Sequence, residues 1–162
     1  MPVIKIETEI KACKNKVFDL SRSIDLHKIS TKHTREEAIA GVTSGLLGRN
    51  ESVTWRAKHF GIYQTLTSKI TEFDKPDYFV DEMESGIFNR FKHEHIFVEQ
   101  NEITVMTDIF DYKSPLGFLG KIVDFVFLEN YMRNLLQKRN EIIKGFAESE
   151  KWKEVIPNVY EA

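Results

Sequence analysis

Apolar and polar residues alternate at the start of the chain. From Ile4 to Ala12, every second residue is isoleucine, threonine or alanine, and the residues between them are lysine or glutamate. This period of two is typical of a β-strand with one buried face. The sequence therefore predicts a half-buried strand as the first element.

The spacing of the apolar residues changes after Asn15. In KVFDLSRSIDLHKIS (16–30) they recur at intervals that suit two short helices. Ser23 or Asp25 is suited to cap the second helix, because short polar side chains accept hydrogen bonds from the free amides of a first turn. We therefore expect two short helices directly after the first strand.

The stretch from Thr31 to Asn50 is polar and contains three glycines. It predicts a short strand near Glu36 to Ala40, followed by a mobile loop. The loop sequence GVTSGLLG has the glycine content of a flexible gate over a pocket, but a plain surface loop is the more frequent explanation.

The middle of the chain has the pattern of consecutive strands. In ESVTWRAKHF, one side carries Val53, Trp55, Ala57 and His59, and the other side is mostly polar. Gly61 permits a turn before YQTLTSKITEF, and another strand is expected at YFVDEM. Two long strands should follow, at 88–98 and 103–112, which makes about seven strands in the whole chain.

The period changes again near the C-terminal end. Ser114 and Pro115 are suited to the N-cap and first position of a helix, and apolar residues then recur at helical spacing up to about Ala147. We expect one helix from Phe118 to Phe146, and some 30 residues would make it roughly 45 Å long. Residues 149–162 should form an irregular tail that folds back or frays.

The order of the elements is strand, two short helices, six strands and one long helix. Hairpin-length connections predict an antiparallel sheet that twists and curls, and the long helix is the only element able to cover its concave face. We therefore predict an α+β protein in which residues 1–162 form a single domain. A gap should remain wherever the side chains between sheet and helix are short or polar. That gap is the predicted pocket.

The stretch FKHEHIFVE mixes aromatic and polar residues in an unusual way. Residues two apart on a strand point the same way, so Phe91, His93, His95 and Phe97 share one face. A hairpin loop centred between Gln100 and Asn101 would fix the register with the next strand. The pairs would then be Phe91 with Phe110, His93 with Asp108, His95 with Met106 and Phe97 with Thr104.

We take the aromatic and histidine face as the inner one, because the opposite face is charged at one end. Trp55, Ala57 and His59 would line the same concavity, and Phe79, Asp81 and Met83 could join them. Arg139 interrupts the apolar stripe of the long helix, and we expect it to reach solvent beyond its stem instead of pairing with Glu129 or Asp108. The predicted ligand-binding residues are Trp55, His59, Phe91, His93, His95, Phe97, Met106, Asp108 and Phe110.

Three interpretations of the histidines remain open. They could be structural residues whose hydrogen bonds are satisfied within the protein. They could also form the polar end of a cavity for an amphipathic small molecule, together with Asp108. The third interpretation is a metal or acid–base site, because H-x-H on a strand can chelate an ion and a histidine oriented by a carboxylate can act as a general base.

Composition excludes some classes of partner. The chain has 23 basic and 25 acidic residues and no long basic run, so nucleic acid is not an expected partner. Its single cysteine, Cys13, cannot form an intramolecular disulfide, and the start lacks the features of a secretory signal, which favours a cytoplasmic location. The apolar run FLGKIVDFVFL is shorter than the roughly 20 residues that span a bilayer, so we expect no stable membrane insertion.

Several sequence stretches together resemble a known superfamily. GVTSGLLG, VTWRAKHFG, KPDYFVDEM, GIFNRFKHEHIF, SPLGFLG and LLQKRNEIIKGF follow one another in the order seen in the START-like, helix-grip superfamily (SRPBCC). The similarity extends from about Ile4 to Phe146 and is strongest to a bacterial branch described as polyketide cyclase/dehydrase-like. That branch has a proline in the middle of GIF, where this chain has Ile87.

The resemblance implies a helix-grip fold, with a cavity that in various relatives binds lipids, sterols, hormones or polyketides. It transfers no catalytic residue, because the branch supplies none to match. We therefore expect a protein that binds a hydrophobic or amphipathic small molecule, without a cofactor or metal. One alternative is a cyclase or dehydratase-type enzyme that uses His93 and Asp108 as acid and base. Another is a structural or protein-interaction module without a ligand. The sequence does not indicate the oligomeric state.

Overall fold

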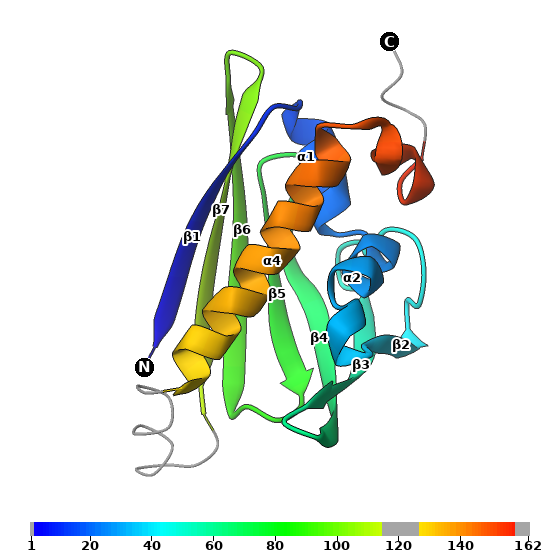
Figure 1. Cartoon of the computed structure of the whole chain (residues 1–162), viewed down its shortest axis with the longest axis vertical. Helices are drawn as coiled ribbons and strands as arrows, with labels where there is room; N and C mark the ends of the chain where they lie inside the picture. The colour runs from blue at the N-terminus through cyan, green and yellow to red at the C-terminus, as the bar shows by residue number, and fades with distance from the viewer. Residues whose placement is uncertain (1, 115–126, 158–162) are drawn as a thin grey trace.

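A computed structural model describes residues 2–114 and 127–157 of the chain. In this part of the chain, seven strands form one antiparallel sheet and three α-helices pack beside it (Figure 1). Two short 3-10 helices are also described there. The elements are β1 (Val3–Ile10), α1 (Lys14–Ser21), α2 (Ile24–Ser30), β2 (Glu37–Gly41), β3 (Ser52–His59), β4 (Ile62–Asp74), β5 (Tyr78–Ser85), β6 (Arg90–Gln100), β7 (Ile103–Lys113) and α4 (Glu129–Ala147), with the 3-10 helices at Lys32–Thr34 and Glu150–Glu154.

The strand order in the sheet is β1-β7-β6-β5-β4-β3-β2. Strands β2 to β7 follow one another as hairpins, while β1 pairs with β7 at the far edge. The chain between β1 and β2 contains α1 and α2, and α4 crosses the curved sheet on one face (Figure 1). This arrangement confirms the predicted fold: a curved antiparallel sheet that grips a long C-terminal helix.

The buried face of α4 contains a polar patch within an apolar stripe. Leu136, Ile143 and Phe146 recur at helical spacing and are buried, and burying a side chain of this size contributes about 1.5–3 kcal/mol. Arg139 and Asn140 lie between them in the same stripe and are also buried. The helix therefore presents two polar side chains to the sheet near its middle.

Helix α1 fills one end of the space between the sheet and α4. The ring of Phe18 makes edge-to-face contacts with Phe73, Phe79 and Phe97, each at a centroid distance of 5.3 Å. Such pairs contribute about 0.5–1.5 kcal/mol beyond the area that they bury. This end of the concave face is thus a packed core.

The second helix and the tail agree with the sequence pattern in part. Ser23 caps α2, because its hydroxyl accepts a hydrogen bond from the amide of Leu26. The tail folds back as far as residue 157: it forms a 3-10 helix and buries Trp152, Val155 and Ile156.

The long helix was expected to begin at Phe118, but residues 115–126 lie outside the described part of the chain. Its end at Ala147 agrees with the structure.

The predicted register of the last hairpin was wrong by two residues. The turn consists of Asn101 and Glu102, with φ of 52° and 63°, which is the type I′ geometry of a two-residue hairpin. It therefore lies one residue later than expected. A shift of two residues leaves every side chain on its predicted face. The observed pairs are Phe91 with Tyr112, His93 with Phe110, His95 with Asp108 and Phe97 with Met106.

Within residues 2–114 and 127–157, no helix has both the length and the apolar character needed to span a bilayer.

Candidate functional site

A cavity of about 240 Å³ lies between the sheet and α4. An engineered apolar cavity of about 150 Å³ already binds benzene, so this space can admit a ligand larger than one ring. Its described lining comes mainly from β3 to β7, α2 and α4, with Ser21 of α1 and residues of the connecting segments. The apolar walls include Trp55, Leu66, Ile70, Phe79, Leu135 and Leu136.

Six of the nine predicted ligand-binding residues line this cavity. They come from β3, β6 and β7 and share the inner face of the sheet, as their alternating pattern indicates. The strand period was sufficient to identify them, because the inner face was chosen correctly. The six are Trp55, His59, Phe91, His93, His95 and Phe110.

The other three predicted residues are buried away from the described lining. Phe97 packs against Phe18, and the hydroxyl of Ser21 contacts the sulfur of Met106 at 3.3 Å, so α1 occupies the space in front of both. Asp108 lies behind the two histidines and is fully buried. Met83 is on the inner face as well, but it packs beside Phe91 and Phe110 and is not among the described lining residues.

Asp108 is the centre of a buried polar group, which we call the Asp108 cluster. Its Oδ1 lies 3.0 Å from Nε2 of His93 and 2.9 Å from Nδ1 of His95. The second contact is an ion-pair distance without hydrogen-bond geometry, because the His95 N–H does not point at the oxygen. Asn140 donates to the other carboxylate oxygen at 2.6 Å. The cluster consists of Asp81, His93, His95, Asp108, Arg139 and Asn140.

Arg139 belongs to this cluster, so the expectation that it reaches solvent was wrong. Its Nη1 lies 3.5 Å from Oδ1 of Asp108 and donates to Oδ1 of Asn140 at 3.1 Å. Its Nη2 donates to the backbone carbonyl of Ser21 at 3.0 Å. The side chain is buried because α1 lies beside α4 and supplies a carbonyl acceptor for the guanidinium.

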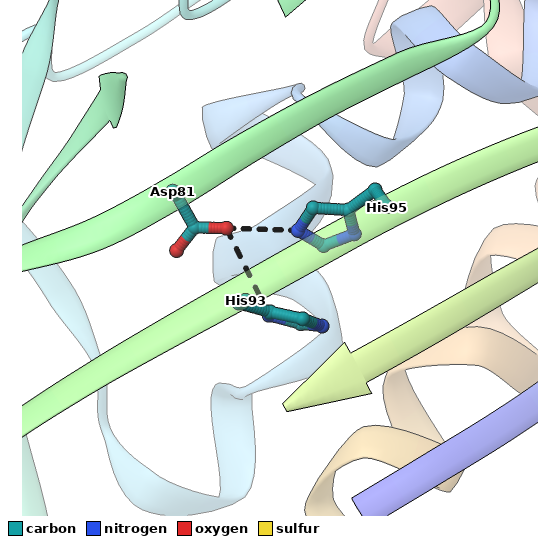
Figure 2. A group of neighbouring side chains, drawn as sticks. All are labelled: Asp81, His93 and His95. Carbon is teal, nitrogen blue, oxygen red and sulfur yellow. Dashed lines mark hydrogen bonds and ion pairs between the residues drawn. The ribbon is translucent and has the colours of Figure 1, made fainter. Parts of the chain in front are cut away.

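Asp81 on β5 completes the cluster on the cavity side. Its Oδ1 lies 2.8 Å from Nε2 of His95 and 3.8 Å from Nδ1 of His93 (Figure 2). Strand β5 places it directly opposite His93 in the sheet. Asp81 and both histidines line the cavity, so a ligand there would meet all three side chains.

The protonation states in the cluster follow from burial and pairing. Burial alone would raise the pKa of Asp108, but the hydrogen bond from His93, the contact with His95 and the charge of Arg139 hold it well below its usual value. The pKa of Asp81 is lowered in the same way by His95 and His93, against the effect of burial. Both carboxyls are therefore ionised at neutral pH.

The pKa values of the two histidines are shifted in opposite directions. The pKa of His93 is lowered, chiefly by burial and then by the charge of His95. Burial also lowers the pKa of His95, but its two carboxylate partners, Asp108 and Asp81, outweigh that effect and raise it. The two carboxylates beside it thus favour the charged form of His95, whereas burial favours the neutral form of His93.

A second polar group lines another part of the cavity, and we call it the Glu36 cluster. Nδ1 of His59 lies 2.7 Å from the hydroxyl of Tyr131, and Nε2 of His27 lies 3.5 Å from Oε1 of Glu36. All four residues line the cavity. Sequence reasoning found only His59, because the other three come from α2, the segment before β2, and α4, which no motif connects.

Burial and pairing also shift the pKa values in the Glu36 cluster. It is the main reason that the pKa of His59 is lowered and that of Tyr131 is raised. Burial would also raise the pKa of Glu36, but the charge and hydrogen bond of His27 lower it. Glu36 is thus an ionised carboxylate in the cavity wall, paired with His27.

The exposed part of the described lining is at one end of the sheet. Phe60 lies in the turn between β3 and β4 and is 56% exposed, and Ile87 in the β5–β6 connection is 37% exposed. Phe60 stacks near Tyr131 at the start of α4, with ring centroids 4.7 Å apart. These residues mark the end at which the described lining meets solvent.

No protein-family model and no curated protein matches the chain. Solved structures do match it over most of its length. The protein TTHA0849 from Thermus thermophilus aligns with a TM-score of 0.69 and 18% identity, covering 88% of this chain and 97% of that one. The ginseng (Panax ginseng) major latex-like protein 151 aligns with a TM-score of 0.67 and 14% identity, covering 91% and 98%.

A START superfamily protein from Mycobacterium smegmatis also matches, with a TM-score of 0.65 and 10% identity over 90% of this chain and 97% of that one. At these identities the likeness is one of fold. The strand order, the position of α4 and these matches lead to one conclusion: the chain has the helix-grip fold of the START-like proteins.

Proposed function

We propose that this protein binds a small amphipathic molecule in the cavity between the sheet and α4. The observation that carries the proposal is the combination of apolar walls with two polar clusters in one cavity of about 240 Å³. Binding sites for small molecules usually have this composition, with a few polar groups that orient the ligand. A purely structural polar core would not need a cavity beside it.

The charges of the lining favour a neutral ligand that carries hydroxyl groups. Among the described lining residues, both arginines are already paired: Arg22 with Asp19 at 2.6 Å and Arg139 with Asp108 at 3.5 Å. Asp81 and Glu36 are carboxylates that accept hydrogen bonds, and an anionic ligand would be repelled by them. A hydroxylated aromatic or polycyclic compound fits these contacts better than a fatty acid.

The first experiment asks whether the cavity holds a ligand. Mass spectrometry of the purified protein under native conditions should detect a co-purified small molecule, and calorimetry should show tighter binding of 2-naphthol than of 2-naphthoate, which has the same rings but carries a carboxylate in place of the hydroxyl. Ala57→Phe places a ring into the cavity from β3 and should abolish binding. Ala40→Phe makes the same change at an exposed position on β2 and should leave binding intact.

Two results would refute this proposal. One is equal binding of naphthol by the Ala57→Phe and Ala40→Phe variants, because it would place the ligand outside the cavity. The other is an absence of any co-purified or added ligand in the folded wild-type protein.

A second candidate function is enzymatic, and the His93–Asp108 contact favours it. The carboxylate of Asp108 holds Nε2 of His93 at 3.0 Å, and the lowered pKa keeps the ring neutral. His93 lines the cavity and could accept a proton from a carbon next to a carbonyl, as cyclase or dehydratase chemistry requires. His93→Gln should then retain the ligand and lose its conversion. Recovery of every bound ligand unchanged from the wild-type protein would exclude this candidate.

A further inference from the structure

We propose that Asp81, His93 and His95 form a binding site for one divalent transition-metal ion of the Zn²⁺ type, with a coordination position open to the cavity. Each residue offers one ligand atom, and these atoms all lie within 4.8 Å of one another. Figure 2 shows the carboxylate of Asp81 on β5 directed at the rings of both histidines on β6.

The orientation of the two rings is the main argument. Nε2 of His93 and Nδ1 of His95 both lie against Oδ1 of Asp108, at 3.0 and 2.9 Å. The opposite nitrogens, Nδ1 of His93 and Nε2 of His95, therefore both face Asp81 (Figure 2). Histidines that bind metal commonly direct their other ring nitrogen to a carboxylate, which fixes the ring and its tautomer.

The supporting carboxylate is itself fixed by residues outside the site. Asn140 donates to its second oxygen at 2.6 Å, and Arg139 lies 3.5 Å from the first. Asp108 is fully buried, so water does not replace it as the partner of the histidine rings. Asp108 thus orients His93 from behind by a hydrogen bond and lies at ion-pair distance from His95, on the side away from the cavity.

The distances are compatible with an ion after small side-chain movements. Ligand atoms on a tetrahedral zinc ion lie about 3.4 Å apart, since zinc binds nitrogen and oxygen at about 2.0–2.2 Å. Oδ1 of Asp81 lies 2.8 Å from one candidate nitrogen and 3.8 Å from the other. Side-chain movements of less than about 1 Å would bring both of these distances to the required spacing.

The donor set indicates the class of ion. Two imidazoles and one carboxylate suit Zn²⁺ or Fe²⁺ and leave at least one position open, whereas Ca²⁺ requires six to eight oxygen ligands. If both imidazoles are neutral, a divalent ion and Arg139 carry three positive charges, and Asp81 and Asp108 carry two negative charges. The site would then keep one net positive charge. The open position would therefore favour an anionic oxygen, such as hydroxide or the phenolate or enolate form of a cavity ligand.

This site goes beyond the proposed ligand-binding function and does not depend on it, because the ion needs no organic ligand. It is also incompatible with His93 as a general base, since the Nδ1 lone pair would be used to bind the ion. Metal binding and proton transfer by His93 can thus be separated by experiment.

The test uses metal alone, without any organic compound. The full chain is treated with a chelator and titrated with Zn²⁺ against a chromophoric competitor, and the visible spectrum of the Co²⁺ form is recorded. We expect one ion per chain and the intense visible bands of four- or five-coordinate cobalt. Asp81→Asn should weaken Zn²⁺ binding at least tenfold and remove these bands, while His33→Ala, which removes an exposed histidine, should change neither.

His93→Gln should have the same effect as Asp81→Asn, and circular dichroism identifies any variant that has not folded. If Asp81→Asn binds Zn²⁺ as tightly as the wild type, the ion sits elsewhere and the proposal is wrong. Binding of less than one ion per chain, or a six-coordinate cobalt spectrum that His33→Ala removes, would also overturn it. Naphthol binding is measured on the metal-free protein with Ala57→Phe and Ala40→Phe, so failure of the metal test leaves the cavity proposal to be judged by those variants.

Discussion

Asn140 on α4 donates a hydrogen bond of 2.6 Å to Oδ2 of Asp108 on β7. The same amide lies 3.2 Å from the hydroxyl of Thr8 on β1, so one helical side chain connects two neighbouring strands. Both Asn140 and Asp108 are buried, and a buried carboxylate oxygen without a donor is costly. The helix therefore contributes to the site by satisfying Asp108 as well as by covering the cavity.

Replacement of Asn140 by leucine tests this role. The substitution retains the approximate shape of the side chain but removes the donor to Asp108, so we expect a loss of about 1–3 kcal/mol in the free energy of unfolding. Urea denaturation followed by circular dichroism measures it. Asn134→Leu makes the same change at an exposed position of α4 and should stay within about 0.5 kcal/mol of wild type. Equal effects of the two substitutions would mean that Asp108 needs no donor from the helix.

Glu36 predicts a dependence of stability on pH. Although burial acts against it, pairing with His27 lowers the pKa of Glu36 below its ordinary value of 4.5. A carboxyl with a lowered folded pKa stabilises the protein above the unfolded pKa, and that stabilisation is lost as the pH falls through the folded pKa. The wild type should thus be more stable than Glu36→Gln near pH 7, and the difference should shrink below about pH 4.5.

Denaturation at a series of pH values measures this difference directly. Glu37→Gln is the matched control. The Glu37 carboxylate lies 2.8 Å from the guanidinium of Arg56, and both side chains are exposed. Exposed pairs contribute little, so this variant should follow the wild type at every pH within about 0.5 kcal/mol. A stability difference for Glu36→Gln that stays constant from pH 7 to pH 3 would contradict the lowered pKa.

The elements of the fold could be predicted because each has a strong period. The alternation in β6 was sufficient to assign Phe91, His93 and His95 to the inner face, and helical spacing located the end of α4 at Ala147. The register could not be derived, because any shift by two residues preserves the same faces. The decisive detail was the type I′ turn, and Asn101 was its only signal in the sequence.

The partners of the polar residues were harder to predict. Arg139 was expected to reach solvent, because an isolated arginine in an apolar stripe usually does. Its actual partners are the carbonyl of Ser21 and the carboxylate of Asp108, which come from α1 and β7. The Glu36 cluster is assembled from four separate segments in the same way. Such contacts depend on tertiary packing, and no local pattern in the chain specifies them.

Phe97 and Phe91 share the inner face of β6 but have different surroundings, and this difference is testable. Phe97 is enclosed by Phe18 and Phe79, so Phe97→Ala should create a cavity and cost about 3–5 kcal/mol. Phe91 borders the existing cavity, and Phe91→Ala should cost less while it changes the affinity for 2-naphthol. Urea denaturation and calorimetry on both variants measure the two effects. A reversed order of stabilities would contradict the division of this face into core and cavity wall.

The β6–β7 turn allows the register itself to be tested. Glu102 has a φ of 63°, in a region that glycine adopts without steric cost, and glycine is the preferred second residue of a type I′ turn. We therefore expect Glu102→Gly to raise the free energy of unfolding by up to about 1 kcal/mol. Asn101→Ala should lower it by about 1–2 kcal/mol, because alanine tolerates a left-handed conformation less well than asparagine. If the turn were instead centred one residue earlier, Glu102 would lie in a strand and glycine there would destabilise the protein. The sign of the Glu102→Gly effect thus decides whether His95 or His93 lies directly opposite Asp108.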